Sequence, residues 1–317
     1  MSKRSTATFI EYDLRPAKQA ERRMILDMLE SMKEAGLQIS DYRYIGMGGI
    51  KFYDFSMVYR FLGIKDLISF ERNKVVAKRG VYNKPFGLID VRNESISNYL
   101  KSDLKYKPTI CWLDYDNSLS ESIIDDIRDI GTRIPAGSAV FVTVASEMPR
   151  DFLSMSEAER LSQVIEDFGV LAADVDVVDV EEANFGRVYY KILRAAFTNS
   201  FAARDEAEFL PCFRVVYNDS LKMLTYGGAF VSEHNVKPFL KSVRRRMPFL
   251  FRDISAPYSI RTINMTERER HLMEFSSTAR LNCAEANKLR SLGYKAEDIS
   301  AYRDLVRFMP RYVETLM

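Results

Sequence analysis

Apolar and polar positions follow two rhythms along the chain. Five short apolar runs, at residues 42–47, 65–71, 87–91, 109–114 and 139–145, alternate with stretches whose apolar residues recur at offsets of three and four. Short apolar runs are typical of buried strands, and offsets of three and four are typical of amphipathic helices. The alternation therefore predicts an α/β domain with a parallel sheet that is covered on both faces.

A helix is expected before the first strand. Pro16 suits the first helical turn, and an apolar stripe from Ile25 to Met32 continues until Gly36. Projected at 100° per residue, four charged side chains fall on or beside this inward stripe: Arg15, Lys18, Glu21 and Arg22. These side chains could form a salt-bridged brace against an acidic loop. Alternatively, they line a substrate or cofactor pocket, and Arg15 and Lys18 are the candidates for that lining.

The second half of the chain changes character. Residues 147–205 are too long for one crossover and hold two expected helices, at 156–168 and 186–203. Two runs, at 212–217 and 221–231, flank the turn residues 218–220 and predict an antiparallel hairpin. The rest is helical, so we expect an N-terminal helical cap (1–40), a sheet domain (41–235) and a C-terminal helical extension (236–317).

Composition narrows the class of protein. The 317 residues contain 46 basic and 44 acidic side chains, so the net charge of +2 predicts neither nucleic acid nor an acidic membrane as a partner. The three cysteines, Cys111, Cys212 and Cys283, lie far apart in the sequence, which favours a reduced cytoplasm over a disulfide framework or a structural zinc. No apolar run approaches 18 residues, which argues against a membrane span.

The ends of the predicted strands carry the candidate chemistry, because a parallel sheet binds its ligand beyond the carboxyl ends of its strands. The first strand ends in glycines, which let the backbone turn sharply and approach a ligand. A carboxylate after the second strand can accept both ribose hydroxyls, and a polar side chain after the third can bind the adenine amine. The residues are Gly46, Gly48, Gly49, Glu71, Asp90, Asp114 and Asp116. The set suits an adenosine-bearing ligand.

Each signal is weak by itself, since a glycine pair is often only a turn and a strand-end acid is often only a helix cap. Asp116 and Asn117 could serve as a turn or cap beside Ser118, which has Glu121 at capping-box spacing. If the strand persists instead, Asp114 and Asp116 share one face. One could then accept a proton while the other orients the substrate. Binding of a divalent metal, which needs about six oxygen ligands, has thin support, and no metal is predicted.

The order of these elements resembles that of the class I S-adenosylmethionine-dependent methyltransferases over roughly residues 41–231. Three stretches are similar to bacterial proteins described as putative O-methyltransferases: Tyr12-Asp-Leu-Arg-Pro-Ala-Lys, Tyr44-Ile-Gly-Met-Gly-Gly and Trp112-Leu-Asp-Tyr-Asp. The resemblance implies a Rossmann-like, doubly wound, mostly parallel sheet that is closed by an antiparallel hairpin, and S-adenosylmethionine as cofactor. It also implies that the cofactor residues are Gly46, Met47, Gly48 and Gly49 for the methionine part, Glu71 with Arg72 for the ribose, Asp90 for the adenine edge, and Asp114 facing the reacting centre.

Two departures qualify the resemblance. The family's first strand commonly carries an acid two residues before the first glycine, and Tyr44 stands there. This favours an alternative, a catalytically degenerate binding or regulatory protein in a multi-component complex, unless Asp114 or the basic residues of the first helix compensate. The Asp/Asn-Pro-Pro-aromatic motif of enzymes that methylate base amino groups is also missing. A dinucleotide dehydrogenase fits less well, because its third glycine would fall at Lys51.

The methyl acceptor and the oligomeric state are not predicted. Nucleic acid is a possible partner through the basic triplet Arg244, Arg245 and Arg246, but a solvated or salt-bridged helix end is the favoured interpretation.

Overall fold

The computed structural model describes residues 15–101, 104–218, 221–278 and 283–310. In this part of the chain one eight-stranded sheet has the order β3-β2-β1-β4-β5-β7-β6-β8. Its strands are β1 (Arg43–Gly46), β2 (Asp66–Phe70), β3 (Ile89–Arg92), β4 (Thr109–Ser118), β5 (Ser138–Ala145), β6 (Glu208–Asn218), β7 (Lys222–Val231) and β8 (Tyr258–Ile260). The strand order runs in opposite directions from β1 and β4, so the switch point lies between these two strands.

The expected α/β class is confirmed. Strands β1 to β5 pair in parallel, and β7 pairs antiparallel with both β5 and β6. The antiparallel hairpin therefore closes the sheet as expected, although residues 219–220 of its predicted turn lie outside the described residues. The short strand β8, which pairs in parallel with β6, was not predicted, because three residues are too few to show a periodicity.

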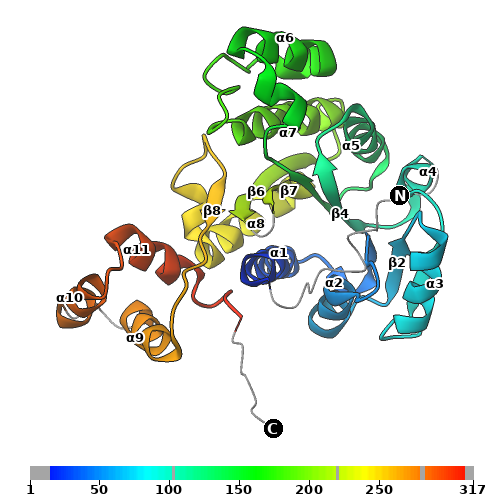
Figure 1. Ribbon diagram of the computed structural model, residues 1–317. Helices are drawn as coiled ribbons and strands as arrows, with labels where there is room; N and C mark the ends of the chain where they lie inside the picture. Colours follow the sequence, from blue (N-terminus) through cyan, green and yellow to red (C-terminus); the bar gives the residue numbers. More distant parts are fainter. Residues whose placement is uncertain (1–14, 102–103, 219–220, 279–282, 311–317) are drawn as a thin grey trace.

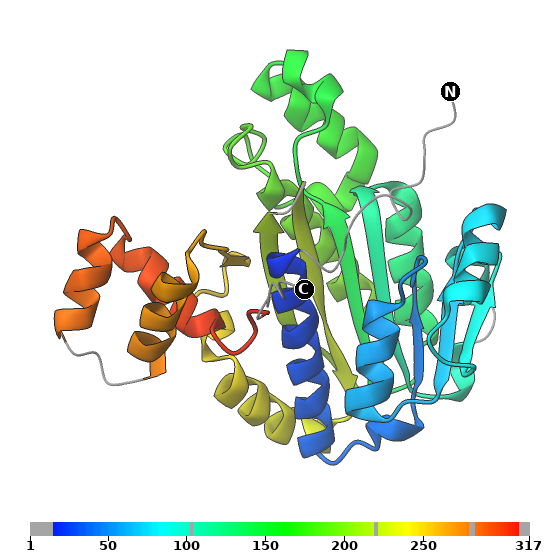
Figure 2. The same ribbon diagram turned by 60° about the horizontal axis from the view of Figure 1, so that its bottom comes forward.

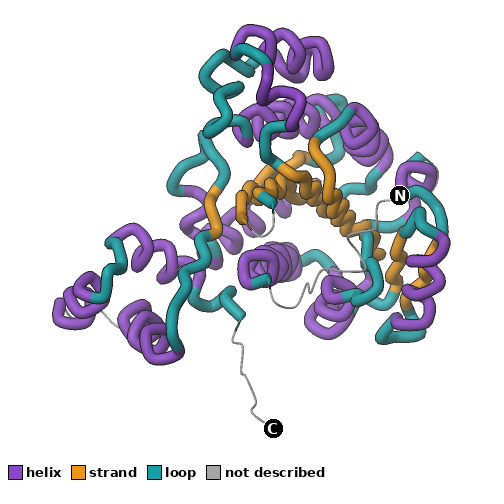
Figure 3. Tube along the Cα trace, viewed as in Figure 1, coloured by secondary structure: helices purple, strands orange, loops and turns teal. Residues whose placement is uncertain are grey.

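Helices cover both faces of the sheet, and the last three helices form a separate group beside it (Figures 1, 2 and 3). The helices of the described residues are α1 (Pro16–Glu34), α2 (Tyr53–Met57), α3 (Lys74–Asn83), α4 (Ile96–Leu100), α5 (Glu121–Arg133), α6 (Glu157–Phe168), α7 (Gly186–Phe201), α8 (Glu233–Arg246), α9 (Glu267–Thr278), α10 (Cys283–Ser291) and α11 (Ala296–Leu305). Short 3-10 turns occupy Ile39–Asp41, Leu104–Tyr106, Arg150–Ser154, Gly169–Ala172 and Pro248–Phe251, and a π-helical turn, Val58–Leu62, continues α2.

Two hydrophobic cores flank the sheet, and β4 shows how alternation divides them. Ile110 and Trp112 belong to the core that contains α1, α2 and α8, whereas Cys111 and Leu113 belong to the core that contains α5 and α7. Successive side chains of a strand point to opposite faces. The next residue, Asp114, therefore falls on the face covered by α1.

Helix α1 is an integral part of the first core. Ile25, Met28, Leu29 and Met32 are buried there, as the apolar stripe predicts. In the C-terminal part, α9, α10 and α11 share a separate small cluster that includes Met273. The domain boundaries at residues 40 and 235 stay predictions.

The basic triplet lies at the end of α8. Arg245 and Arg246 are both ion-paired with Glu34 of α1, and Arg246 also contacts Asp27. Arg244 lies over the ring of Phe251. Arg245 and Arg246 thus connect α8 to α1, which matches the salt-bridged alternative.

Candidate functional site

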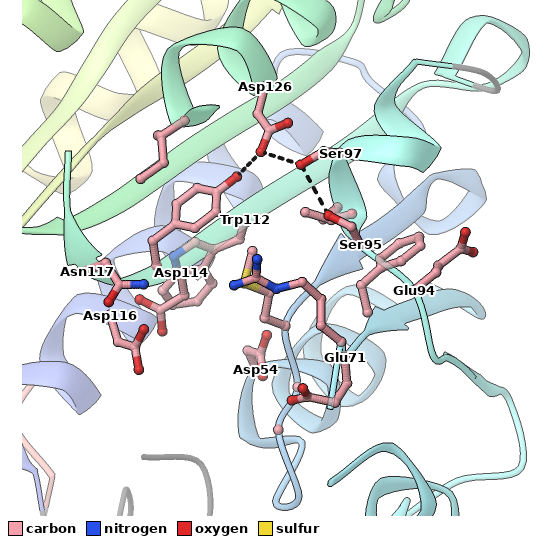
Figure 4. Close-up of a pocket in the computed structure, with 18 of the residues that line it drawn as sticks. Asp54, Glu71, Glu94, Ser95, Ser97, Trp112, Asp114, Asp116, Asn117 and Asp126 are labelled. Atoms are coloured by element: carbon pink, nitrogen blue, oxygen red, sulfur yellow. Dashed lines mark hydrogen bonds between the residues drawn. The ribbon is translucent and has the colours of Figure 1, made fainter. Parts of the chain in front are cut away.

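A cavity of about 440 Å³ opens at the carboxyl ends of β1, β2 and β4, beside the switch point of the sheet (Figure 4). Its walls come from the glycine turn after β1, the segments after β2 and β3, the end of β4 and the start of α5. Of the residues expected at the site, the cavity brings together Met47, Gly48, Gly49, Glu71, Arg72, Asp114 and Asp116. Gly46, Asp90, Arg15 and Lys18 are not among the lining residues.

The glycine turn packs tightly under the cavity. The Gly48 N–H donates to Ser69 Oγ of β2 (3.1 Å), and Gly49 has φ of +56°, a value that favours glycine. A Cβ at Gly48 would lie 2.5 Å from Cδ1 of Phe52, whose buried ring occupies that space. The turn therefore needs glycine for packing and conformation, and its backbone forms part of the cavity wall.

Glu71 and Arg72 follow β2 and line the cavity. The Asn73 N–H donates to Glu71 Oε1 (2.7 Å), and the Asn93 side chain donates to the carbonyls of Glu71 and Arg72 (2.8 and 3.0 Å). These bonds tie the end of β2 to the segment after β3. They orient the Glu71 carboxylate at the cavity wall.

Asp90 occupies a different place from the one that the sequence suggested. It lies inside β3, and Arg92 Nε donates to its carboxylate (2.8 Å). The strand continues to Arg92, two residues further than Asp90, so its carboxyl end is displaced along the chain. The residues that reach the cavity from this strand end are Glu94, Ser95, Ile96 and Ser97.

Asp114 and Asp116 lie on β4, which continues to Ser118 with a register irregularity between Asp114 and Ser118. The N-cap of α5 is Ser120, so the predicted capping box of Ser118 and Glu121 is wrong. Because β4 is longer than its apolar run, both acids and Asn117 extend along the cavity. The strand interpretation of these acids is therefore the one that the structure supports.

Lys18 of α1 reaches the site through Asp114. Its Nζ donates to Asp114 Oδ1 (2.8 Å) and to the Tyr217 hydroxyl (3.0 Å), and it pairs with Glu21 Oε2 (2.8 Å). The side chain is 2% exposed. Burial by itself would lower the pKa of Lys18, but the carboxylates of Asp114 and Glu21 outweigh it and raise the pKa. Lys18 is thus a charged brace beneath one wall of the cavity.

Arg22, one helical turn further along α1, lines the cavity itself. It is 5% exposed, and its guanidinium lies over the ring of Tyr53 at 5.4 Å. Among the described residues, its Nε and Nη1 atoms have no hydrogen-bond partner. The inward stripe of α1 therefore contributes both a brace and a lining residue.

Three acids of the cavity were missed by the sequence analysis: Glu94, described above, and the two acids Asp54 and Asp126. Asp54, in the first turn of α2, accepts a hydrogen bond from the Tyr44 hydroxyl (2.5 Å). Asp126 of α5 accepts from the Tyr115 hydroxyl (2.6 Å) and from Ser97 (3.1 Å), as Figure 4 shows. Asp126 carried a signal, because it is an acid inside the isoleucine stripe of α5.

Burial dominates the electrostatics of both acids. Burial raises the pKa of Asp54, while the Tyr44 hydrogen bond and the charge of Arg22 oppose the rise. Burial also raises the pKa of Asp126, against the hydrogen bonds from Tyr115 and Ser97. No group of three or more His, Cys, Asp or Glu residues that could hold a metal ion occurs in the described part of the chain.

Comparisons with known proteins place the chain in a family. The family described as "Putative O-methyltransferase" matches residues 10–317. No curated protein matches the sequence. None of the described helices is both long and apolar enough to cross a bilayer.

Several solved structures align with part of this chain at low identity. Trm1 from Pyrococcus horikoshii, solved with S-adenosyl-L-methionine, is 10% identical with a TM-score of 0.43, over 70% of this chain and 58% of that one. The plantazolicin methyltransferase BpumL, solved with SAH and a substrate analogue, is 9% identical with a TM-score of 0.40, over 67% and 85%. LepI, solved in complex with SAM, is 9% identical with a TM-score of 0.35, over 61% of this chain. The match spans 43% of LepI, so less than half of that protein is covered.

Proposed function

The chain belongs to the family described as putative O-methyltransferases, and we propose that it transfers a methyl group from S-adenosylmethionine to an acceptor hydroxyl in the cavity beside β1, β2 and β4. One observation carries this proposal. The glycine turn of residues 46–49, the acid Glu71 and the acid Asp114, which are separated in sequence, border the same cavity. Only Gly46 of this set stands outside the lining.

The lining suits the cofactor. The backbone at Gly48 and Gly49 can approach the methionine part closely, and the Glu71 carboxylate can accept hydrogen bonds from both ribose hydroxyls. Arg72 borders the same wall. Of the described lining residues, six are acids and three are cationic, which favours a ligand with a positive sulfonium. The acids are Asp54, Glu71, Glu94, Asp114, Asp116 and Asp126, and the cationic residues are Arg22, Lys51 and Arg72.

The adenine subsite needs a different assignment from Asp90. Apolar side chains of Phe70, Ile96 and Ile123 line the cavity beside the hydroxyls of Ser95 and Ser97. Apolar walls with a few convergent polar groups are typical of sites for a flat heterocycle. We assign the adenine ring to this region, in which the segment after β3 supplies the polar contacts.

The two β4 acids are the candidate catalytic groups. When bound, S-adenosylmethionine supplies a methyl group that is activated by a positive sulfur. Lys18 pairs with Asp114 Oδ1 and partly neutralises that carboxylate, which suits Asp114 to orient the acceptor. Asp116 is then the base that accepts the proton of the acceptor hydroxyl. Buried Lys18 fixes the geometry, on which methyl transfer depends most.

The acceptor remains of unknown class. A cytoplasmic location fits the cysteine content, and a role of the triplet Arg244, Arg245 and Arg246 in nucleic-acid binding is disfavoured, because two of its members are paired with Glu34. Metal is not part of this proposal.

Calorimetry on the full chain with S-adenosylmethionine and its demethylated product tests the proposal. We expect both compounds to bind, and we expect labelled methyl groups to enter a component of a cell extract. Asp116→Asn should retain cofactor binding and lose transfer. Absence of binding to either compound would contradict the proposal. Tight binding without transfer in any extract would favour the degenerate binding protein.

A further inference from the structure

Two side chains of opposite formal charge line the cavity near Tyr53, because the Arg22 guanidinium lies over the Tyr53 ring and Asp54 is the next residue of the chain. Asp54 comes from α2 and Arg22 from α1, and both side chains line the cavity. Their charges interact, since Arg22 opposes the rise in the pKa of Asp54 that burial causes. A ligand that carries both an anion and a cation would find a partner for each here.

Asp54 is fixed in place from beneath. The donor of its hydrogen bond, the Tyr44 hydroxyl, belongs to a side chain that is 1% exposed and packs edge-on against Phe55 at 4.9 Å between ring centroids. This bond engages Oδ2. A carboxylate has two oxygens and about four acceptor sites, so Asp54 can accept further hydrogen bonds from a ligand in the cavity.

Arg22 has the opposite property, since its donors are incompletely used. A guanidinium has five N–H donors, and burial of a charged donor without a partner costs free energy. The Nε and Nη1 atoms of Arg22 find no hydrogen-bond partner among the described residues, although the side chain is almost fully buried at the cavity wall. An anion in the cavity can accept a charge-assisted hydrogen bond from this guanidinium, because carboxylates are strong acceptors for guanidinium donors.

We propose that Asp54 and Arg22 hold the amino-acid end of the methyl donor, with Asp54 binding the α-ammonium group and Arg22 the α-carboxylate. The inference rests on the proposed function. It also accounts for Tyr44, whose hydroxyl positions an acid that α2 supplies in place of an acid on β1.

Calorimetry with three ligands tests the two contacts of this clamp, by which we mean Asp54 with the α-ammonium group and Arg22 with the α-carboxylate, one at a time. S-adenosylmethionine carries both groups, its decarboxylated form keeps only the ammonium, and 5′-methylthioadenosine has neither. Asp54→Asn, which keeps an acceptor for Tyr44, should lower the affinity for the first two ligands about 10- to 100-fold and leave the affinity for the third unchanged. Arg22→Met should weaken S-adenosylmethionine alone, by a similar factor.

Controls keep a folding defect apart from a lost contact. Unchanged binding of 5′-methylthioadenosine reports an intact adenosine site in each variant, and Arg22→Lys should fall between Met and the wild type because it keeps the charge. If either variant lowers the affinity for all three ligands equally, or for none of them, the assignment of Asp54 and Arg22 is wrong while the proposed function stands. If the wild-type protein binds none of the three, the proposed function itself fails and the clamp fails with it.

Discussion

Replacement of Lys18 by methionine is the sharpest probe of how α1 supports the site. The substitution keeps the length and apolar character of the stem and removes the ammonium group, which pairs with Glu21 and Asp114 at 2.8 Å each. Glu21 is 0% exposed and accepts a further hydrogen bond from Thr225. Without Lys18, a buried carboxylate loses its cationic partner.

The expected cost follows from this burial. Removal of one partner of a buried ion pair costs about 3–5 kcal/mol. This is a large part of a total stability of roughly 5–15 kcal/mol. The free energy of unfolding at pH 7 should fall by that amount. The double variant Lys18→Met with Glu21→Gln should recover most of the loss, because the amide leaves no buried charge and its oxygen can still accept from Thr225.

The pH dependence has a definite sign. Burial raises the pKa of Glu21, and Lys18 opposes that rise, so the pKa is higher still in Lys18→Met. A carboxyl group whose pKa is higher in the folded than in the unfolded protein destabilises the fold as the pH rises from the unfolded-state pKa through the folded-state pKa. The loss of unfolding free energy in Lys18→Met, relative to the wild type, should therefore grow as the pH rises and shrink in acid.

Urea unfolding followed by circular dichroism, at several pH values, measures these differences. Lys33→Met is the matched control, because this lysine of the same helix is 58% exposed and its ion pair with Glu30 is long, at 4.0 Å. It should change stability by less than about 0.5 kcal/mol. A Lys18→Met protein within about 1 kcal/mol of the wild type at pH 7 would refute the account of a buried charged brace.

Three further predictions concern the cavity and the contact between α1 and α8. Glu71→Ala should weaken S-adenosylmethionine about 10- to 100-fold by calorimetry and leave the melting temperature unchanged; equal affinity would contradict the ribose assignment. A hydrogen bond from Arg246 is the main reason why the pKa of Glu34 falls to about 2. Glu34→Gln should therefore lower the free energy of unfolding at pH 7. This loss of stability should vanish as the pH falls from the ordinary glutamate pKa towards 2. A deficit that persists at pH 2 would count against this pairing. Gly48→Ala should cost about 1–3 kcal/mol in thermal unfolding, whereas Gly87→Ala, where an added Cβ meets nothing within 4 Å, should cost little; equal costs would contradict the packing argument.

Much of the fold was predictable because its signals are local. The five parallel strands and the hairpin each show an apolar run, and the rule for parallel sheets then places Gly48, Glu71 and Asp114 at one edge. The cavity brings these three residues together.

The remaining site residues depend on strand lengths and on long-range packing. Asp90 was chosen as a strand end, but β3 continues to Arg92, because Val91 and Arg92 still pair with Ser69 and Phe70 of β2. Asp54 is fixed by a side chain ten residues away on a different element, and periodicity carries no information about such a contact. Arg22 was visible on the inward stripe, but only the tertiary structure decides which residue of that stripe reaches the cavity.

A crystal structure of the full chain grown with S-adenosylhomocysteine would show whether the cavity at the strand ends is the cofactor site. We expect density for the ligand across the ends of β1, β2 and β4, with its ribose hydroxyls on Glu71 and its amino-acid end between Asp54 and Arg22. Ligand density in another part of the protein, or an empty cavity at saturating ligand, would show that the cofactor does not bind at these strand ends.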